Sequence, residues 1–252
     1  MGFQGHIFYE DVDNVALSNI AVPVTDTKLS IVSGDFAKVP ENYNKLIIYH
    51  AQGAAITRAR LIAPSLKARG DIEILPIDDA AEPTSNFFPQ KQIENPIQLT
   101  SGEKLSAETT NSGAAAIEQA VAVWLADDAI TPITGAEILH VDFTATIPAA
   151  LRTWSNAVMV LGRALEAGEY MIVGMRAESA TGLYARIVFS DDSMRPMVIM
   201  YDDEADIEDP IFRNGRLGEF GRFKEDAPPR IECFCDAGDT AIQGILDIVK
   251  VA

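Results

Sequence analysis

The stretch from Gly168 to Tyr201 constrains the fold more than any other part of the chain. Side chains in it alternate with a period of two, most clearly on the apolar face that holds Leu183, Ala185, Ile187 and Phe189. Such alternation is typical of a β-strand with one face in a core. The residues from Met171 to Met175 alternate in the same way, and the small residues 179–182 favour a turn between the two runs. The stretch therefore predicts a hairpin of two long strands, followed by a third strand that starts at a proline.

Strand-like segments of this kind recur along the whole chain. It has 252 residues, of which 48% are hydrophobic and 23% charged, as expected of a folded protein with one large or two small domains. Turn residues separate about eight strand candidates in each half. Residues 114–126 are rich in Ala, which tolerates a helix, but their alternation favours a strand. Ile147–Leu165 is the most helix-like segment because Pro148 suits a helix start, although Asn156–Leu161 within it could instead form a strand.

The two halves of the chain are weakly similar to each other at a spacing of about 125 residues. Each half closes on a segment with a glycine turn between two strand candidates, residues 105–123 in the first half and 231–248 in the second. Eight short antiparallel strands in a half of this size match a jelly roll. We therefore predict an all-β fold of two tandem eight-stranded antiparallel jelly rolls, residues 1–128 and 129–252, with at most one or two short helices.

The charge balance excludes several classes of partner. The chain has 37 acidic against 20 basic residues, a formal net charge of −17. Direct binding to nucleic-acid phosphates or to an anionic lipid surface needs clustered Lys and Arg, and the best local candidate is the segment from Arg213 to Lys224. No apolar run approaches the roughly 20 residues of a membrane span. The first residues resemble no signal peptide, which predicts synthesis and folding in a cytoplasm.

Motifs for catalysis or cofactor binding are missing from the sequence. We find no phosphate-binding loop, nucleophile elbow or zinc-binding helix motif, so we expect no enzymatic activity, no cofactor and no metal centre. Cys233 and Cys235 share one face of a predicted strand and are expected to be reduced and packed. The acidic run 202–209 is expected to be a solvated loop, with an ion or salt-bridge contact as the alternative. Carboxylate pairs for glycoside hydrolysis stay open because such pairs form only in the fold.

The second half of the chain resembles bacteriophage capsid proteins of jelly-roll type. The residues that carry this resemblance are Ala167–Tyr170, Ile172–Met175, Ala185–Phe189, Arg195-Pro196, Phe212–Gly218, Phe220-Gly221, Phe223, Pro228–Glu232 and Leu246–Val249. The paired-roll layout is similar to the major capsid proteins of membrane-containing icosahedral phages, in which three copies make a pseudo-hexagonal capsomer. The resemblance implies a non-enzymatic shell subunit that is made in the host cytoplasm and located in the virion. It also implies partners: further copies of itself and other virion proteins. Whether a viral membrane lies beneath the shell stays open. The chain is short for that family, so a decoration or other virion role stays open.

Two segments are the candidates for contacts between subunits. One is the long loop 78–95 with Phe87 and Phe88, which could instead fold back as a lid on their own core. The other is the glycine- and arginine-rich segment 212–223, whose candidates are Arg213, Arg216 and Phe220; an anion site is its alternative. Arg195 is a further candidate that the resemblance suggests.

Two other functions compete with the capsid interpretation. A carbohydrate-binding or adhesive β-sandwich predicts an exposed aromatic platform, but Trp124 and Trp154 both lie in apolar patterns. A hydrolase on a β scaffold predicts a cleft that holds carboxylates of shifted pKa.

Overall fold

The chain folds into two compact all-β units. The computed structural model describes residues 2–77, 90–113, 115–147, 152–189, 194–201, 210–235 and 240–251. The N-terminal unit is His6–Ala129, and the C-terminal unit is Ile130–Ala252 together with Met1–Gly5. Against the rolls expected at 1–128 and 129–252, the first five residues thus belong with the second half. The only helical segments described are two short 3-10 turns, η1 (Pro64–Arg69) and η2 (Pro210–Phe212). The predicted all-β class is confirmed, and no helix in the described ranges is long and apolar enough to span a bilayer.

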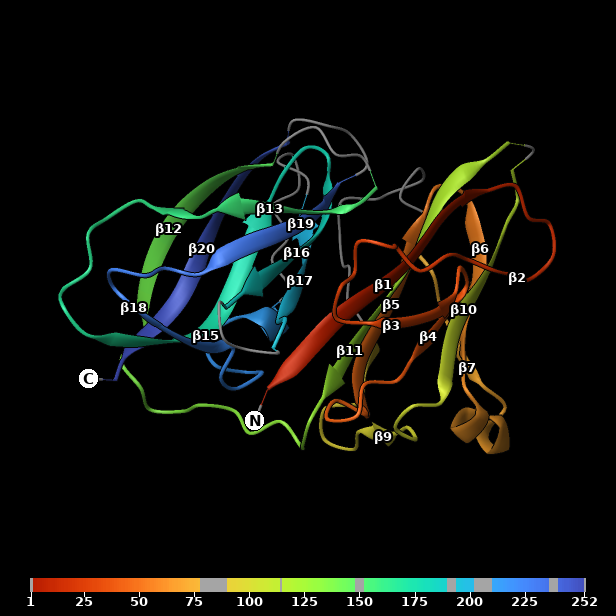
Figure 1. Cartoon of the computed structure of the whole chain (residues 1–252), viewed down its shortest axis with the longest axis horizontal. Helices are drawn as coiled ribbons and strands as arrows, with labels where there is room; N and C mark the ends of the chain where they lie inside the picture. Colours follow the sequence, from red (N-terminus) through yellow and green to blue (C-terminus); the bar gives the residue numbers. More distant parts are fainter. Residues whose placement is uncertain are drawn as a thin grey trace. The chain divides into compact units, whose positions relative to one another are not determined.

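The N-terminal unit is built from two sheets (Figure 1). The first has the order β1-β11-β5-β8, with β9 also pairing β5. Its strands are β1 (Phe3–Val12), β5 (Lys45–Gly53), β8 (Gln90–Lys91), β9 (Ile97–Gln98) and β11 (Ile117–Ala126). The second has the order β3-β4-β10-β6-β7, with β2 pairing β10. Its strands are β2 (Ser18–Asn19), β3 (Ser30–Ser33), β4 (Phe36–Lys38), β6 (Ile56–Ile62), β7 (Ile72–Ile74) and β10 (Lys104–Asn111).

The centre of the N-terminal unit is the antiparallel pair of β5 and β11. Their register runs from Gln119 opposite Gly53 to Ala126 opposite Lys45, with one irregularity after Trp124. Residues 46–53 and 119–126 are buried on both faces, so these two strands are apolar on both sides over most of their length. The strand predicted for residues 114–126 is confirmed over Ile117–Ala126.

The C-terminal unit is a single nine-stranded sheet that nearly closes on itself. Its order is β13-β19-β16-β17-β15-β20-β12-β14, and β18 also pairs β15. The strands are β12 (Leu139–Ile147), β13 (Trp154–Val158), β14 (Val160–Leu161), β15 (Glu169–Glu178), β16 (Gly182–Val188), β17 (Met197–Tyr201), β18 (Gly221–Lys224), β19 (Arg230–Cys235) and β20 (Thr240–Lys250).

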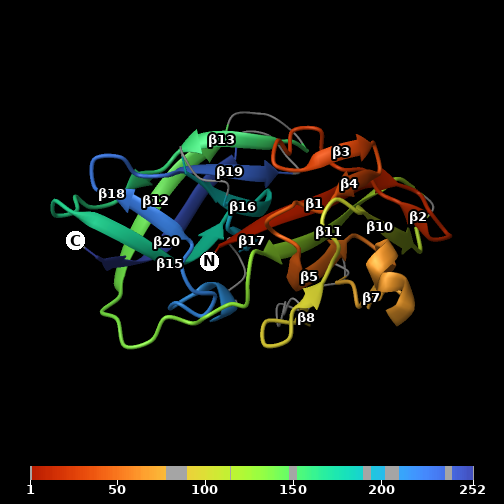
Figure 2. The same cartoon turned by 60° about the horizontal axis from the view of Figure 1, so that its bottom comes forward.

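One buried residue, Met159, connects the two ends of this sheet. It joins β13, which is one end of the sheet, to β14, which is the other end. β13 pairs β19, whereas β14 pairs β12 at Phe143 and Thr144. One continuous segment therefore connects the two ends of the sheet, and β13 runs close to β12 where they meet (Figure 2). Closure of this kind removes most of the free edge of a sheet.

The hairpin predicted for residues 168–190 is wrong in its pairing, although both of its strands exist. β17 lies between β15 and β16, parallel to the first and antiparallel to the second. The turn is where the sequence places it: the Ser179 hydroxyl accepts hydrogen bonds from the backbone N–H groups of Thr181 and Gly182 at 3.3 and 3.2 Å. The turn therefore leads from β15 to β16 without a direct pairing of the two, because β17 lies between them and pairs with both.

The helix predicted for Ile147–Leu165 is also wrong. Residues 148–151 lie outside the described residues, and residues 154–158 and 160–161 form β13 and β14. The alternative strand over Asn156–Leu161 comes closer. Trp154 and Ala157 are buried while Val158 and Val160 are exposed, because β13 and β14 are the end strands of the sheet. Pairing with β19 and β12 overrides the weak helical pattern.

More of β16 is buried than the alternation of its apolar and polar side chains predicts. Leu183 is only half-buried, whereas Tyr184 and Arg186, on the face expected to be the more polar one, are fully buried. β16 therefore has a buried charged residue in the middle of the unit.

Candidate functional site

The predicted contact residues fall into different environments. Phe87 and Phe88 lie outside the described residues, with residues 78–89. Phe220 is fully buried, and its ring meets that of Phe3 edge to face, with centroids 5.0 Å apart. Arg195 is 7% exposed, and its guanidinium donates to the carbonyl of Met194 at 2.6 Å. The side chains of Phe220 and Arg195 thus serve the interior of the C-terminal unit, and a role in subunit contacts stays a prediction.

Arg213 and Arg216 lie on the loop between η2 and β18. Asn214 and Gly215 both have positive φ angles, 54° and 74°, which Asn and Gly adopt more readily than other residues. The loop is fixed to the sheet because Gly215 N–H donates to the carbonyl of Val173 at 2.8 Å. Arg213 is half-buried, whereas Arg216 is exposed. Of the predicted contact residues that the structure describes, Arg216 is thus the one whose side chain lies in solvent.

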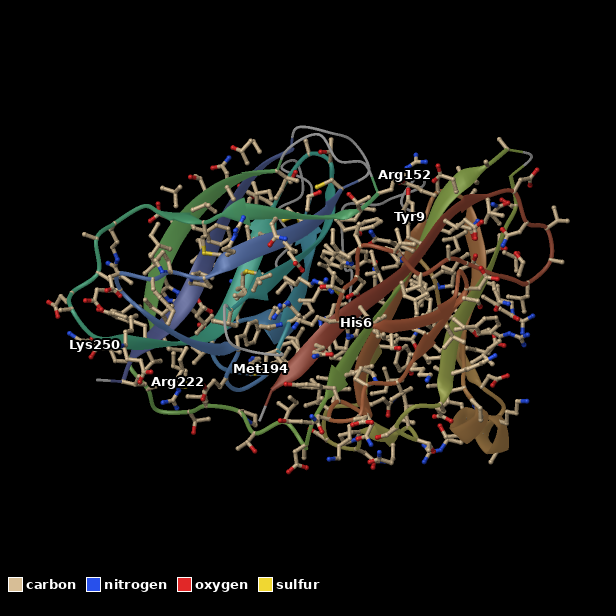
Figure 3. The ribbon with its side chains drawn as sticks, viewed as in Figure 1. His6, Tyr9, Arg152, Met194, Arg222 and Lys250 are labelled. Carbon is tan, nitrogen blue, oxygen red and sulfur yellow. The ribbon has the colours of Figure 1, made fainter. Side chains whose placement is uncertain are left out.

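The first residues of β1 dock onto the segment before β17. Gly5 N–H donates to the carbonyl of Arg195 at 2.8 Å, and Arg195 N–H donates to the carbonyl of Phe3 at 3.2 Å, which makes a parallel bridge. Met194, labelled in Figure 3, would collide with a Cβ placed on Gly2, and Met197 would collide with one on Gly5. The two glycines therefore permit a close approach of backbone to side chain that a larger residue would prevent.

A buried ion pair that the sequence reasoning missed lies beneath this docked segment. Arg186 Nε donates to Glu232 Oε2 at 2.6 Å, and Arg186 Nη1 donates to the carbonyl of Gly5 at 3.2 Å. The guanidinium also lies over the ring of Trp154, 3.9 Å from its centroid. Asn156 donates its side-chain amide to Glu232 Oε1 at 3.3 Å. The sequence feature that could have indicated this pair is one basic and one acidic residue, each inside an otherwise apolar strand.

His140 contacts a buried carboxylate at the surface of this unit. His140 Nδ1 lies 2.7 Å from Asp247 Oδ1; the imidazole side chain is 54% exposed and the carboxylate is 2% exposed. Asp247 Oδ2 also accepts the backbone N–H of Asn214 at 2.8 Å. The buried carboxylate orients the imidazole. Across the described ranges, no group of three or more His, Cys, Asp or Glu is placed to hold a metal ion.

Cys233 and Cys235 are free and buried, as the sequence predicts. Burial raises the pKa of the Cys233 thiol well above its ordinary value, and the neighbouring Cys235 and Glu232 add to the shift. A thiol of this kind is a poor nucleophile at neutral pH. Both tryptophans are buried as well, so neither forms the exposed platform that a carbohydrate-binding module needs.

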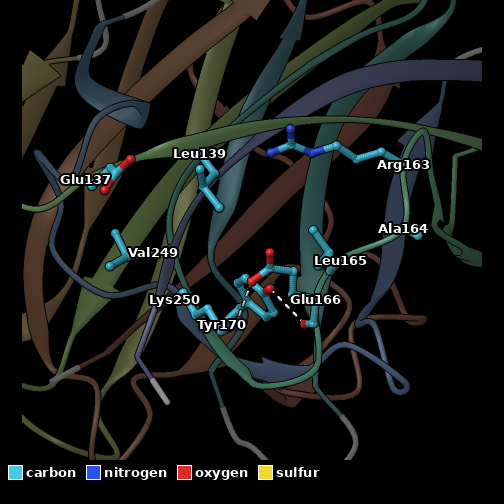
Figure 4. A pocket seen from close by; sticks show the side chains of 9 residues that line it. All are labelled: Glu137, Leu139, Arg163, Ala164, Leu165, Glu166, Tyr170, Val249 and Lys250. Carbon is cyan, nitrogen blue, oxygen red and sulfur yellow. Dashed lines mark hydrogen bonds and ion pairs between the residues drawn. The ribbon is translucent and has the colours of Figure 1, made fainter.

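A pocket of about 550 Å³ opens at one end of the C-terminal unit. Figure 4 shows it between the start of β12, the end of β20 and the loop that joins β14 to β15. Its lining is Glu137, Leu139, Arg163, Ala164, Leu165, Glu166, Tyr170, Val249 and Lys250. A volume in this range and a position at the mouth of a closed sheet are typical of small-ligand sites.

Two polar contacts hold the loop wall of this pocket in place. The hydroxyl of Tyr170 donates to the backbone carbonyl of Glu166 at 2.8 Å, and Lys250 Nζ lies 3.0 Å from Glu166 Oε2. The hydrogen bond to Glu166 raises the pKa of Lys250, so its ammonium stays charged at neutral pH. Behind Tyr170, the ring of Phe223 stacks at 5.7 Å and fixes the position of the hydroxyl. Nothing in the sequence pattern pointed to this pocket, because its walls come from three distant segments.

Comparisons with known proteins add little. No family model matches the chain, and no curated protein matches its sequence. One similar solved structure is the major capsid protein P2 from bacteriophage PM2. The alignment covers 99% of this chain and 98% of that one, with 7% sequence identity and a TM-score of 0.24. At this TM-score the likeness assigns neither a family nor a function.

Proposed function

We propose that this protein is a structural subunit of a phage virion, most simply the repeating subunit of an icosahedral shell, with no enzymatic activity. The observation that carries the proposal is the division of one chain into two compact all-β units, each with its own buried core. The sequence resemblance to jelly-roll capsid proteins over the second half supports it independently. The partners in this proposal are further copies of the chain, grouped as trimers, and other virion proteins rather than nucleic acid.

The surface of the protein suits a role in assembly. Antiparallel rolls bury their cores and protect most strand edges, which leaves loops at their ends free for contacts. Closed symmetric rings are the usual product when such subunits associate. In this proposal the loop that contains Arg216 contacts an acidic surface of a neighbouring copy, since a chain with a net charge of −17 offers such surfaces widely.

The test is the mass of the purified protein in solution, measured by light scattering and accompanied by negative-stain imaging. We expect trimers, with three times the 27.3 kDa mass of the chain, or larger shells. Arg216→Glu should weaken assembly and leave the unfolding transition unchanged. The matched control is Arg69→Glu, because Arg69 is also exposed, lies on η1 of the N-terminal unit and undergoes the same change of charge.

The two parts of the proposal fail separately. A clean monomer at high concentration would remove the shell-forming role. Normal assembly of Arg216→Glu would remove only the assignment of this loop as a contact. If Arg69→Glu disrupted assembly as strongly as Arg216→Glu, the effect would be one of overall charge rather than of a particular contact.

A further inference from the structure

The pocket of the C-terminal unit combines an apolar floor with a charged rim. Five of its lining residues are apolar or aromatic: Leu139, Ala164, Leu165, Tyr170 and Val249. Its charged residues are two acids and two bases: Glu137, Glu166, Arg163 and Lys250. On a chain with a net charge of −17, a site with equal numbers of acids and bases is comparatively basic. Surfaces of this composition bind molecules that have an apolar body and one polar end.

The two bases at the rim are not equivalent. Lys250 is already paired with Glu166, and that pair holds the loop wall. Arg163 is exposed and makes no hydrogen bond or ion pair with any other residue of the described ranges. In Figure 4 its side chain extends from the loop across the pocket, toward Leu139 and away from the pair of Lys250 with Glu166. Its guanidinium is therefore available to a ligand at the point where the apolar floor meets the rim.

The position of Arg163 defines the charge of the ligand. A guanidinium offers parallel N–H donors that match the geometry of a carboxylate, and such charge-assisted pairs are stronger than neutral hydrogen bonds. Glu137 lies on the opposite wall and is exposed, so it repels an anionic group on that side. These two residues therefore orient an anionic end toward Arg163, with the apolar body over Leu139 and Leu165.

We propose that this pocket is a binding site for small carboxylic acids with an apolar chain or ring, in which Arg163 binds the carboxylate. The apolar body of the ligand lies against Leu139, Leu165, Val249 and the ring of Tyr170. The Tyr170 hydroxyl keeps its hydrogen bond to the Glu166 carbonyl, so it positions the loop and is not available to the ligand. All of its residues come from one unit of one chain, so the site is complete without a second subunit.

The test is isothermal titration of the intact protein with octanoate, with octan-1-ol and octylammonium as probes of the same length and different charge. We expect octanoate to bind with one site per chain and the other two to bind at least about tenfold more weakly. Arg163→Gln should weaken octanoate binding about tenfold and leave octanol binding unchanged. Glu137→Gln should strengthen octanoate binding. Leu165→Trp should abolish binding of both octanoate and octanol by filling the floor.

The controls separate binding from damage to the fold. Arg69→Gln removes an exposed arginine of the other unit and should leave all three affinities unchanged. Each variant is first checked for an unaltered urea midpoint. Equal octanoate affinity in the wild type and in Arg163→Gln would overturn the proposal, as would tighter binding of octylammonium than of octanoate. Absence of octanoate binding to the wild-type protein at millimolar concentration would also overturn it.

Discussion

The buried pair of Arg186 and Glu232 should dominate the stability of the C-terminal unit. The Arg186 side chain is completely buried, and that of Glu232 is 10% exposed. Water therefore solvates neither charge well, and the protein groups around them must do so instead. Glu232 faces Arg186 across one strand pair and Asn156 across the next, so the three side chains form a row over β16, β19 and β13.

The loss of unfolding free energy in each variant depends on which buried group loses its partner. Glu232→Leu leaves a buried guanidinium without its carboxylate, which should lower the free energy of unfolding by about 3–5 kcal/mol. Arg186→Met leaves the carboxylate buried in the same way and should cost about as much. The double variant Arg186→Met/Glu232→Leu removes both charges. Its remaining cost is the loss of hydrogen bonds to the Gly5 carbonyl and the Asn156 amide, about 1–3 kcal/mol.

The assay is urea unfolding followed by tryptophan fluorescence. The chain has two tryptophans, Trp124 in the N-terminal unit and Trp154 in the C-terminal unit. All variants are therefore made in a Trp124→Phe background, so that the signal reports only on the unit that contains the ion pair. Trp154 lies directly beneath the guanidinium, which makes it a sensitive probe of this site.

The double variant should be more stable than either single variant. Additive costs, in which the double variant loses the sum of the two single losses, would refute this account of the ion pair. So would a cost below about 1 kcal/mol for Glu232→Leu, because that value is typical of exposed pairs and would mean that water reaches the guanidinium.

Two further predictions test other buried features. His50 is buried in β5, and desolvation lowers its pKa to about 4, while a hydrogen bond with Gln52 partly opposes the shift. The unfolded chain then binds a proton at His50 near pH 6.5 that the folded chain does not, so the free energy of unfolding should fall by about 3 kcal/mol between about pH 7 and pH 4. His50→Gln should remove this part of the pH dependence in urea titrations that follow Trp124. An unchanged slope of the unfolding free energy against pH in that variant would contradict the prediction. His140→Gln, at a half-exposed site, is the control. Gly5→Ala should loosen the docked start of β1, at a cost of about 1–3 kcal/mol, because its Cβ would collide with Met197. Hydrogen exchange of residues 3–5 should speed up in that variant and not in Gly34→Ala, where a Cβ meets no atom within 4 Å; unchanged protection in Gly5→Ala would count against the close approach.

The sequence by itself determined the fold class and the position of most strands. Period-two alternation depends only on where successive side chains of an extended backbone point, so it is visible in any short window. The same local logic found the turn at Ser179, because a turn is made by its own residues. It also identified β11 as a strand, although residues 114–126 are rich in Ala.

Only the tertiary structure decided how the strands pair and which side chains meet. β17 separates β15 from β16, and the segment around Met159 forms a strand instead of a helix, because pairing energies with distant strands exceed the local preference. Arg186 and Glu232 are 46 residues apart, and the pocket draws on residues 137–139, 163–170 and 249–250. No local pattern encodes such contacts, because each residue's neighbours depend on the register of strands far away in the chain.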